Sequence, residues 1–179
     1  SKVGLTDLFN FIASNDNQLS PNSERIFYLK EDYIKTIHAV ISFLQGKNPT
    51  LALQICQDNY LPEASRFDSL QELDWAFGSL GTQDKAKHLA TLYLEDLSDL
   101  IVESADDQFG FSRYAERLGR SASTFDELYG ALQEEPSYID NLLIQILKGK
   151  FEFIQPTLFL LSVPFPGNLY AAFRCAQWV

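Results

Sequence analysis

The chain has 179 residues and a formal net charge of −10 at pH 7, with 24 acidic side chains against 14 basic ones. A surface of this sign lacks the basic field that attracts nucleic acids and anionic membranes, so we expect neither as a partner. Hydrophobic residues make up 46% of the sequence, which favours a buried core over disorder. No apolar stretch approaches the roughly 18 residues that a membrane-spanning helix needs.

The chain has two cysteines, Cys56 and Cys175, which lie far apart in the sequence. Two cysteines in a chain of this length do not make a disulfide framework. We expect both thiols to be reduced and mostly buried, as is usual in the cytoplasm. The predicted location is therefore cytoplasmic.

Most of the chain is predicted to be helical, because apolar residues recur at helical spacing. Gly46 is a predicted helix stop, and Asn48 followed by Pro49 is a typical helix opening. Thr124 and Glu127 have the spacing of a capping box. The helices expected from these signals span residues 5–12, 33–44, 48–56, 69–77, 82–103, 114–118, 125–132 and 136–150.

The segment Thr157–Val163 differs from the rest of the chain, since it is a continuous apolar run of strand length that Pro164 ends. Such a run is typical of a strand buried on both faces in a parallel sheet. Gly167 and Asn168 then open an amphipathic helix, whose apolar residues are Leu169, Ala172, Phe173 and Ala176. A buried strand followed by a helix is half of a βαβ unit.

We therefore predict a mainly α fold with two parts. A multi-helix domain at residues 1–153 precedes a partial strand–loop–helix at residues 154–179, which has the pattern of the start of a Rossmann-like α/β domain. Only residues 26–29 offer a second, weak strand, so we expect the sheet to be mostly absent from this chain. The unpaired strand would expose apolar surface and could mediate a homodimer.

Few residues point to catalysis. His88 has Asp84 one turn before it, and Glu95 and Asp99 follow on the same polar helix face. This spacing could place metal ligands side by side, but the face lies opposite the apolar stripe, and we expect solvated surface pairs there. His38 borders the apolar face of its helix and is expected to be packed or partly exposed.

Three arginines, Arg113, Arg117 and Arg120, share one predicted helical face in an otherwise acidic chain. They could hold a phosphate or a carboxylate, or they could pair with acids of the chain itself. The carboxylate pairs 106–107 and 134–135 lie next to turn signals, and we interpret them as solvated loop charges. Neither a Gly-x-Ser-x-Gly elbow nor a phosphate-binding Gly-Lys-Ser/Thr loop occurs, so a small hydrolase is disfavoured.

The segment 162–170 lies where the predicted strand passes into the next helix. In open α/β sheets, ligands bind at the carboxyl ends of strands, helped by free amides at the start of the following helix. Two prolines stiffen this loop. Its position is compatible with a ligand-facing loop and with a merely rigid connection.

The string Leu160–Trp178, LLSVPFPGNLYAAFRCAQW, resembles a stretch of the bacterial cobalamin-binding radical-SAM proteins known as Fe–S oxidoreductases. Residues 83–89 and 109–118 resemble the helical part that precedes it, so the resemblance covers roughly residues 70–179. It implies a parent enzyme with a Rossmann-like cobalamin domain and a following barrel. That barrel would carry a 4Fe–4S cluster on a Cys-x-x-x-Cys-x-x-Cys motif and cleave S-adenosylmethionine.

This chain departs from the family pattern, because two cysteines cannot hold the cluster and neither histidine lies in an Asp-x-His-x-x-Gly cobalamin motif. By position, the resemblance makes Ser162, Gly167 and Asn168 the cofactor-facing residues of an intact parent. It implies a non-catalytic N-terminal fragment of such an oxidoreductase, without a cofactor of its own, whose partner is the remainder of the parent polypeptide. The alternative is a helical protein–protein interaction domain with no cofactor.

Overall fold

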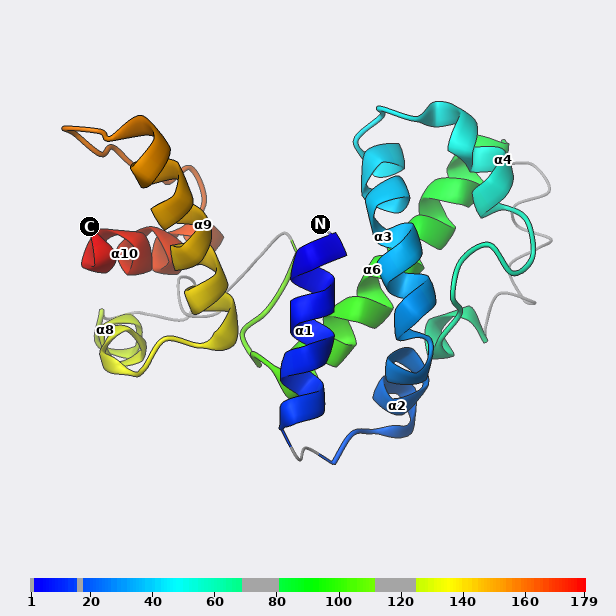
Figure 1. Cartoon of the computed structure of the whole chain (residues 1–179), viewed down its shortest axis with the longest axis horizontal. Coiled ribbons are helices and arrows are strands. Elements are labelled where there is room, and N and C mark those ends of the chain that lie inside the picture. The colour runs from blue at the N-terminus through cyan, green and yellow to red at the C-terminus, as the bar shows by residue number, and fades with distance from the viewer. Residues whose placement is uncertain (1, 16–17, 69–80, 112–124) are drawn as a thin grey trace. The chain divides into compact units, whose positions relative to one another are not determined.

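The structure is a computed structural model, which describes residues 2–15, 18–68, 81–111 and 125–179. These ranges are mainly helical, as predicted, and they contain no strand (Figure 1). The chain forms two compact units, Ser1–Ser104 and Ala105–Val179. The elements of the first unit are α1 (Lys2–Ser14), α2 (Pro21–Tyr28), α3 (Lys30–Leu44), η1 (Pro49–Leu51), α4 (Ala52–Ile55), η2 (Ser65–Phe67) and α6 (Thr82–Ser104). Those of the second unit are α8 (Asp126–Gln133), α9 (Tyr138–Ile154), η4 (Pro166–Asn168) and α10 (Leu169–Trp178).

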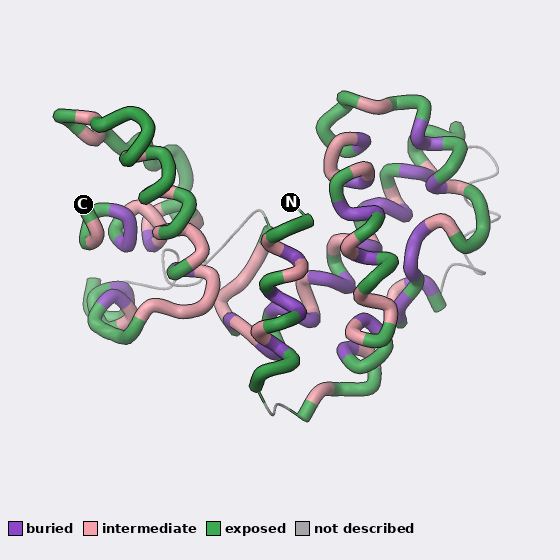
Figure 2. Tube along the Cα trace, viewed as in Figure 1, coloured by how far each residue is buried: buried purple, intermediate pink, exposed green. Residues whose placement is uncertain are grey.

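The long helix α6 forms the centre of the first unit. Its predicted apolar stripe is confirmed, since all of its members are buried: Ala86, Leu89, Ala90, Tyr93, Leu97, Leu100 and Ile101. Helices α2, α3 and α4 and the turn η2 pack against α6, and α1 packs against α3. Figure 2 shows buried residues on each of these helices. The hydrophobic effect therefore stabilises this unit through one continuous apolar face of α6.

Helix α2 begins at a well-formed cap. The side chain of Ser20 accepts a hydrogen bond from the backbone N–H of Ser23, and Pro21 occupies the first helical position, where an N–H would have no partner. Glu103 of α6 accepts hydrogen bonds from the N–H and Oγ of Ser20 and from Oγ of Ser23. A carboxylate at a helix N-terminus is favoured by the helix dipole, so these bonds tie the start of α2 to the end of α6.

The predicted stop after α3 is confirmed. Helix α3 ends at Leu44, and Gly46 follows with a φ of 73°, a left-handed conformation that favours glycine. The predicted opening at Asn48 and Pro49 leads into the 3₁₀ turn η1 and only then into the single-turn helix α4. Asn48 gives no capping bond, because its side-chain oxygen accepts from the hydroxyl of Thr50 instead.

The described residues of the second unit form a small core. It consists of Leu128, Leu132 and Tyr170, with Ala131 and Leu169 packed beside them. Helix α9 contributes no fully buried apolar residue, since Asp140 is its one buried side chain. Five apolar residues of this helix are half-buried or exposed: Ile139, Leu142, Leu143, Ile146 and Leu147.

The predicted capping box of Thr124 and Glu127 stays a prediction, because Thr124 lies outside the described residues. Helix α8 begins at Asp126, after Phe125. The capping box that forms belongs to α9: Oγ of Ser137 accepts from the N–H of Asp140, and the carboxylate of Asp140 accepts from the N–H of Ser137.

The structure corrects the prediction of a strand at residues 157–163. These residues form neither strand nor helix, and most of them are exposed rather than buried. A strand needs a neighbour to accept and donate its backbone hydrogen bonds, and the described part of the chain offers none. The weak candidate at residues 26–29 lies in α2 and its C-cap. The expected exposure of apolar side chains is observed, but the strand and the start of a Rossmann-like domain are not.

Helix α10 confirms the predicted helix after Asn168, although its inward face differs from the expected one. Tyr170, Arg174 and Cys175 are buried, whereas Phe173 is exposed. An arginine is buried here because it finds polar partners, which apolar periodicity does not reveal. The division of the structure at residues 104 and 105 lies elsewhere than the predicted domain boundary at 153 and 154, which stays a prediction.

Candidate functional site

The three predicted cofactor-facing residues lie along the chain before α10. Ser162 is exposed in the irregular segment, Gly167 is half-buried in η4, and Asn168 is exposed at the N-cap of α10. The side chain of Asn168 gives no capping hydrogen bond, while its backbone N–H donates to the carbonyl of Phe165 at 3.0 Å. Gly167 has no positive φ, so its backbone conformation is open to other residues. The structure places the three within one loop and shows no bond among them.

A buried polar cluster anchors the helix that follows this loop. The hydroxyl of Tyr170 donates to Oδ2 of Asp140 at 2.8 Å, and Nε of Arg174 donates to the hydroxyl of Tyr170 at 2.8 Å. Nε of Arg174 also lies 3.1 Å from Oδ2 of Asp140. Burial is the largest cause that raises the pKa of Tyr170 to about 12, so the phenol stays a donor at neutral pH.

The remaining donors of Arg174 bind the end of α8. Nη1 donates to the carbonyl of Leu132 at 3.1 Å, and Nη2 donates to those of Ala131 and Glu134 at 2.9 and 3.0 Å. The last carbonyls of a helix have no partner within the helix, and they carry the negative end of its dipole. One guanidinium therefore joins α8, α9 and α10, and the loop that holds Ser162 and Asn168 leads directly into this fixed helix.

The residues before that loop form the most conspicuous surface of the second unit. Between residues 153 and 165, hereafter the apolar segment, the sequence contains no charged side chain. Leu158 and Leu160 are 72% and 80% exposed. The other large exposed hydrophobic residues of the segment are Phe153, Ile154, Leu161, Val163 and Phe165. Exposed apolar side chains that follow one another in this way are a feature that interaction surfaces share.

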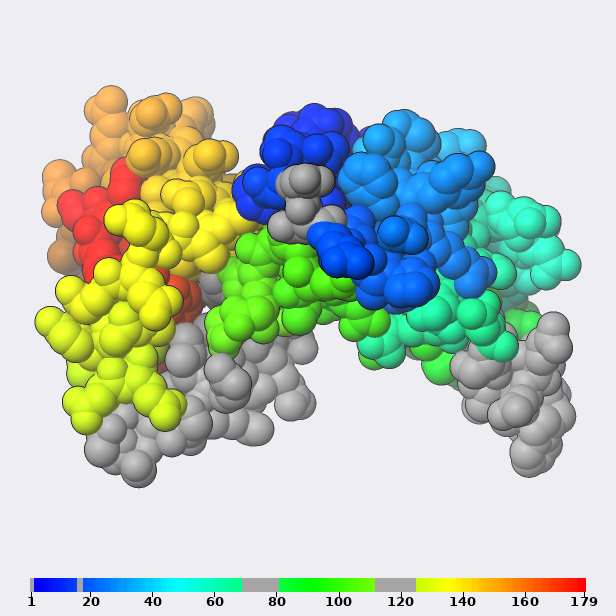
Figure 3. All heavy atoms as spheres, turned by 90° about the horizontal axis from the view of Figure 1, so that it is seen from below, coloured from blue at the N-terminus to red at the C-terminus, as the bar shows by residue number. Residues whose placement is uncertain are grey.

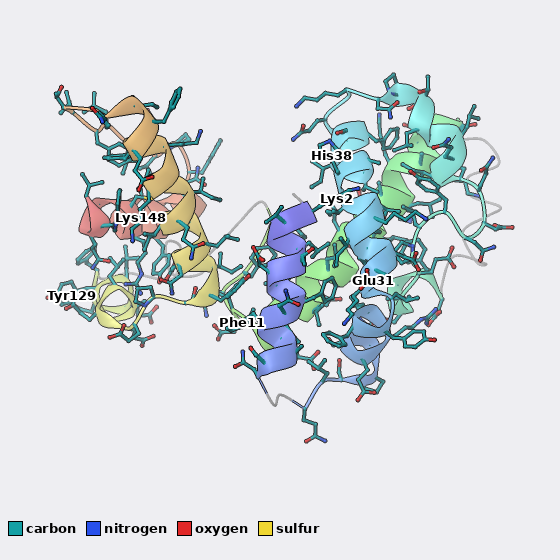
Figure 4. The ribbon with its side chains drawn as sticks, in the orientation of Figure 1. Lys2, Phe11, Glu31, His38, Tyr129 and Lys148 are labelled. Carbon is teal, nitrogen blue, oxygen red and sulfur yellow. The ribbon has the colours of Figure 1, made fainter. Side chains whose placement is uncertain are left out.

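Aromatic contacts hold part of the apolar segment against its own unit. The ring of Phe151 lies 5.2 Å from that of Phe159 and 5.3 Å from that of Trp178, both in edge-to-face geometry. Lys148, labelled in Figure 4, places its ammonium 5.9 Å from the centre of the Trp178 ring. These contacts leave Leu158 and Leu160 outward, so the surface is presented from a packed base.

The predicted acidic face around His88 carries partly exposed ion pairs, as expected. His88 is half-buried, and Asp84 lies 3.8 Å from Lys87. Glu95 and Asp99 turn to Arg66 of η2, whose Nε and Nη2 each donate to Asp99 at 2.9 Å. Among the described residues no group of three metal-binding side chains occurs, and His38 is exposed on α3 (Figure 4).

A buried acid beside Arg66 is a feature that the sequence analysis missed. Asp96 is 0% exposed, and its carboxylate oxygens accept no hydrogen bond of good geometry in the described part of the chain, although the backbone N–H groups of Arg66 and Ala64 lie near enough to lower its pKa. Nε of Arg66 lies 4.0 Å from Oδ1 of Asp96. Burial raises the pKa of Asp96 to about 6, although the neighbouring Arg66 opposes the rise. Its burial could have been predicted from helical periodicity, which places Asp96 beside Tyr93 and Leu100 on the inner face of α6.

Two further predictions concern loop charges and arginines. Asp106 is buried rather than solvated and accepts a hydrogen bond of 2.6 Å from Oγ of Ser137, so it supports the start of α9. Glu134 and Glu135 are exposed, as expected. The arginine cluster at residues 113–120 lies outside the described residues, and its role stays a prediction.

Comparison with known proteins places this chain in no family. No family model matches it, and neither a curated protein nor a solved structure is significantly similar. Within the ranges that the structure describes, no helix has the length and apolar character needed to cross a bilayer. The site therefore has to be interpreted from its own geometry.

Proposed function

We propose that this chain is a non-catalytic helical region of a larger cytoplasmic radical-SAM Fe–S oxidoreductase, and that it attaches to the remainder of that polypeptide through the apolar segment. The observation that carries the proposal is the exposed, uncharged run from Phe153 to Phe165. A partner that covers these water-exposed leucines lowers the free energy of the system, because apolar surface is removed from water. The resemblance of Leu160–Trp178 to the cobalamin-binding radical-SAM proteins supports the enzyme class of the parent.

The backbone of this segment suits addition to a sheet. Residues 156–164 belong to no helix, and Phe165 is extended with φ −133° and ψ 149°. An added strand satisfies its N–H and C=O groups through main-chain hydrogen bonds to a sheet edge. In this proposal residues 157–163 become a strand of the Rossmann-like cobalamin domain when the sheet of the parent is present.

The implied cofactors fit this chain unequally. An iron–sulfur cluster is usually held by four cysteines, and this sequence has two. We therefore assign no cluster chemistry and no cleavage of S-adenosylmethionine to these residues. For cobalamin, the accessible positions of Ser162, Gly167 and Asn168 support a role as part of a binding loop that the parent completes.

An absorbance titration with hydroxocobalamin tests the proposal. The titration compares this chain with the full-length parent, purified without oxygen, whose spectrum also reports an iron–sulfur cluster. We expect the parent to bind cobalamin and to show the cluster, while this chain alone binds weakly or not at all. A parent that binds no cobalamin and shows no cluster overturns the assignment to this enzyme class.

A second candidate is a helical protein–protein interaction domain with no cofactor. The half-buried apolar face of α9 supports it, because this face and the apolar segment belong to one unit with a small core. In that case a separate protein or a second copy of the chain covers the surface. A cofactor-free full-length protein that forms a stable homodimer or heteromer would favour this candidate over the first.

A further inference from the structure

A pocket in the first unit lies away from the residues discussed so far. It has a volume of about 560 Å³ and is formed where α2 meets α3, with residues 59–63 after α4 as the opposite wall. Figure 3 shows the blue atoms of α2 and α3 beside the teal atoms of the segment that follows α4. Pockets of roughly 300–1,000 Å³ are of the size that small ligands occupy.

The floor and walls of the pocket combine apolar and hydroxyl-bearing side chains. Leu61 and Pro62 are buried, and Tyr28 and Tyr60 present aromatic rings. Thr36 lies at the inner end, where its Oγ1 is 3.1 Å from the hydroxyl of the buried Tyr93. A ligand with an apolar middle would therefore replace water along this wall without leaving polar groups unpaired.

Charges of both signs surround this apolar wall. Arg25 and Lys35 are cationic, and Asp32 and Glu63 are anionic. Lys35, Asp32 and Glu63 take part in no ion pair within the part of the chain that the structure describes. Arg25 contacts Asp68 through Nη1 alone, at 3.1 Å, so its other nitrogens are available. The charges balance in a chain whose net charge is −10.

We infer that this pocket binds a small zwitterion of the size of a short peptide. Its carboxylate would lie against Arg25 and Lys35, its ammonium group against Asp32 and Glu63, and its apolar middle over Leu61 and Pro62. A purely anionic ligand would meet two carboxylates, and a purely cationic ligand would meet two cations. The inference rests on the first unit alone and does not depend on the proposed function.

Three tripeptides that differ in charge test this assignment. Alanyl-leucyl-alanine with free termini is the zwitterion, its N-acetyl form is an anion, and its C-terminal amide is a cation. Binding to the 179-residue chain is followed by two-dimensional amide NMR. We expect millimolar binding of the zwitterion, about five-fold tighter than either blocked form, because each partly exposed ion pair contributes up to about 1 kcal/mol. The shifted resonances should include those of Tyr60 and Leu61.

Matched variants separate the pocket charges from general electrostatics. Lys35→Gln and Glu63→Gln should each weaken zwitterion binding about three- to five-fold. The controls Lys47→Gln and Glu31→Gln, exposed positions outside the pocket lining, should leave it unchanged. All four variants change exposed side chains. The midpoint of their thermal unfolding should therefore stay within about 2 °C of that of the unsubstituted chain. Equal binding of the three peptides, or no shift at the pocket at millimolar concentration, overturns the inference.

Discussion

The guanidinium of Arg174 lies 3.1 Å from a carboxylate oxygen of Asp140, and the two side chains are only 5% and 0% exposed. A buried ion pair is costly to desolvate, and it persists here because neighbouring groups form hydrogen bonds with both partners. Tyr170 bridges the pair, Ser137 donates its N–H to Asp140, and three carbonyls accept from Arg174. This pair supplements the small apolar core that the described residues of the second unit form.

Arg174→Met is therefore expected to destabilise the second unit severely. Removal of one partner leaves Asp140 buried without its counter-charge, which costs about 3–5 kcal/mol in comparable pairs. Urea denaturation followed by circular dichroism measures the change. Lys148→Met is the control, since this lysine is exposed and lies over the face of the Trp178 ring, and its change should alter the free energy of unfolding by less than about 0.5 kcal/mol. If Arg174→Met leaves no folded unit to measure, Arg174→Lys should give an intermediate loss of unfolding free energy. Equal stability of both variants and the unsubstituted chain contradicts the role of the pair.

Asp96 should give the first unit an unusual dependence on pH. Its pKa is about 6 in the folded chain, against 3.8 for an unperturbed aspartate, so the folded state binds the proton more tightly. The contribution of this group to stability is fully present below about pH 4 and is lost as the pH rises through 6. A pKa shift of this size corresponds to a difference of about 3 kcal/mol in the free energy of unfolding between low and high pH.

Asp96→Asn removes this titration. We expect the variant to be most stabilised relative to the unsubstituted chain near pH 7, and that advantage in the free energy of unfolding to shrink as the pH falls to 4. Denaturation curves at several pH values measure it. Asp7→Asn, an exposed aspartate on α1, is the matched control and should show a nearly constant difference. A constant difference for Asp96→Asn as well would show that the carboxylate is not protonated in this range.

Glu103 should act in the opposite direction. Burial alone would raise the pKa of Glu103, but hydrogen bonds from Ser23 and Ser20 outweigh it and hold that pKa below its usual value. Its contribution is therefore present above pH 4.5, the unperturbed pKa, and is lost as the pH falls through the lower pKa of the folded state. Glu103→Gln should abolish this loss, as seen in acid titrations of helix content. An unchanged acid transition in the variant is the contrary result.

The apolar segment should make the isolated chain associate with itself at high concentration. Leu158 and Leu160 are its most exposed leucines, and the segment carries no charge that would oppose contact between two copies. Sedimentation velocity over a concentration series should show dimers. The double change Leu158→Ser and Leu160→Ser should abolish them without loss of helix content, because neither side chain is buried. Leu53→Ser, also exposed but outside the segment, should leave the dimers unchanged. A strict monomer at every concentration speaks against the segment as an interface.

Part of this fold could be predicted from the sequence. The stripe of α6 was predictable because its residues repeat over many turns, and each was found buried. The strand at residues 157–163 was predicted wrongly because an apolar run indicates burial only if the chain supplies something to cover it. Periodicity cannot report whether that partner is present.

The polar centres were harder to predict. The burial of Arg174 was not predicted, since a buried arginine depends on carbonyls and carboxylates that are distant in the sequence. Ser137 and Asp140 carried a usable signal, because a serine three residues before an acid is typical of a capping box. The charges of the pocket at α2 and α3 had no such signal, since they come together only when residues 59–63 fold back.

The place of Arg174 in the chain also sets an order in time. The carbonyls of Leu132 and Ala131 at the end of α8 are synthesised 42 and 43 residues before the guanidinium that binds them, so during translation they stay in water. The second unit can close only after the ribosome has released residue 174. The first unit has its complete apolar stripe once α6 has been made and can fold earlier, so the two halves are expected to mature one after the other.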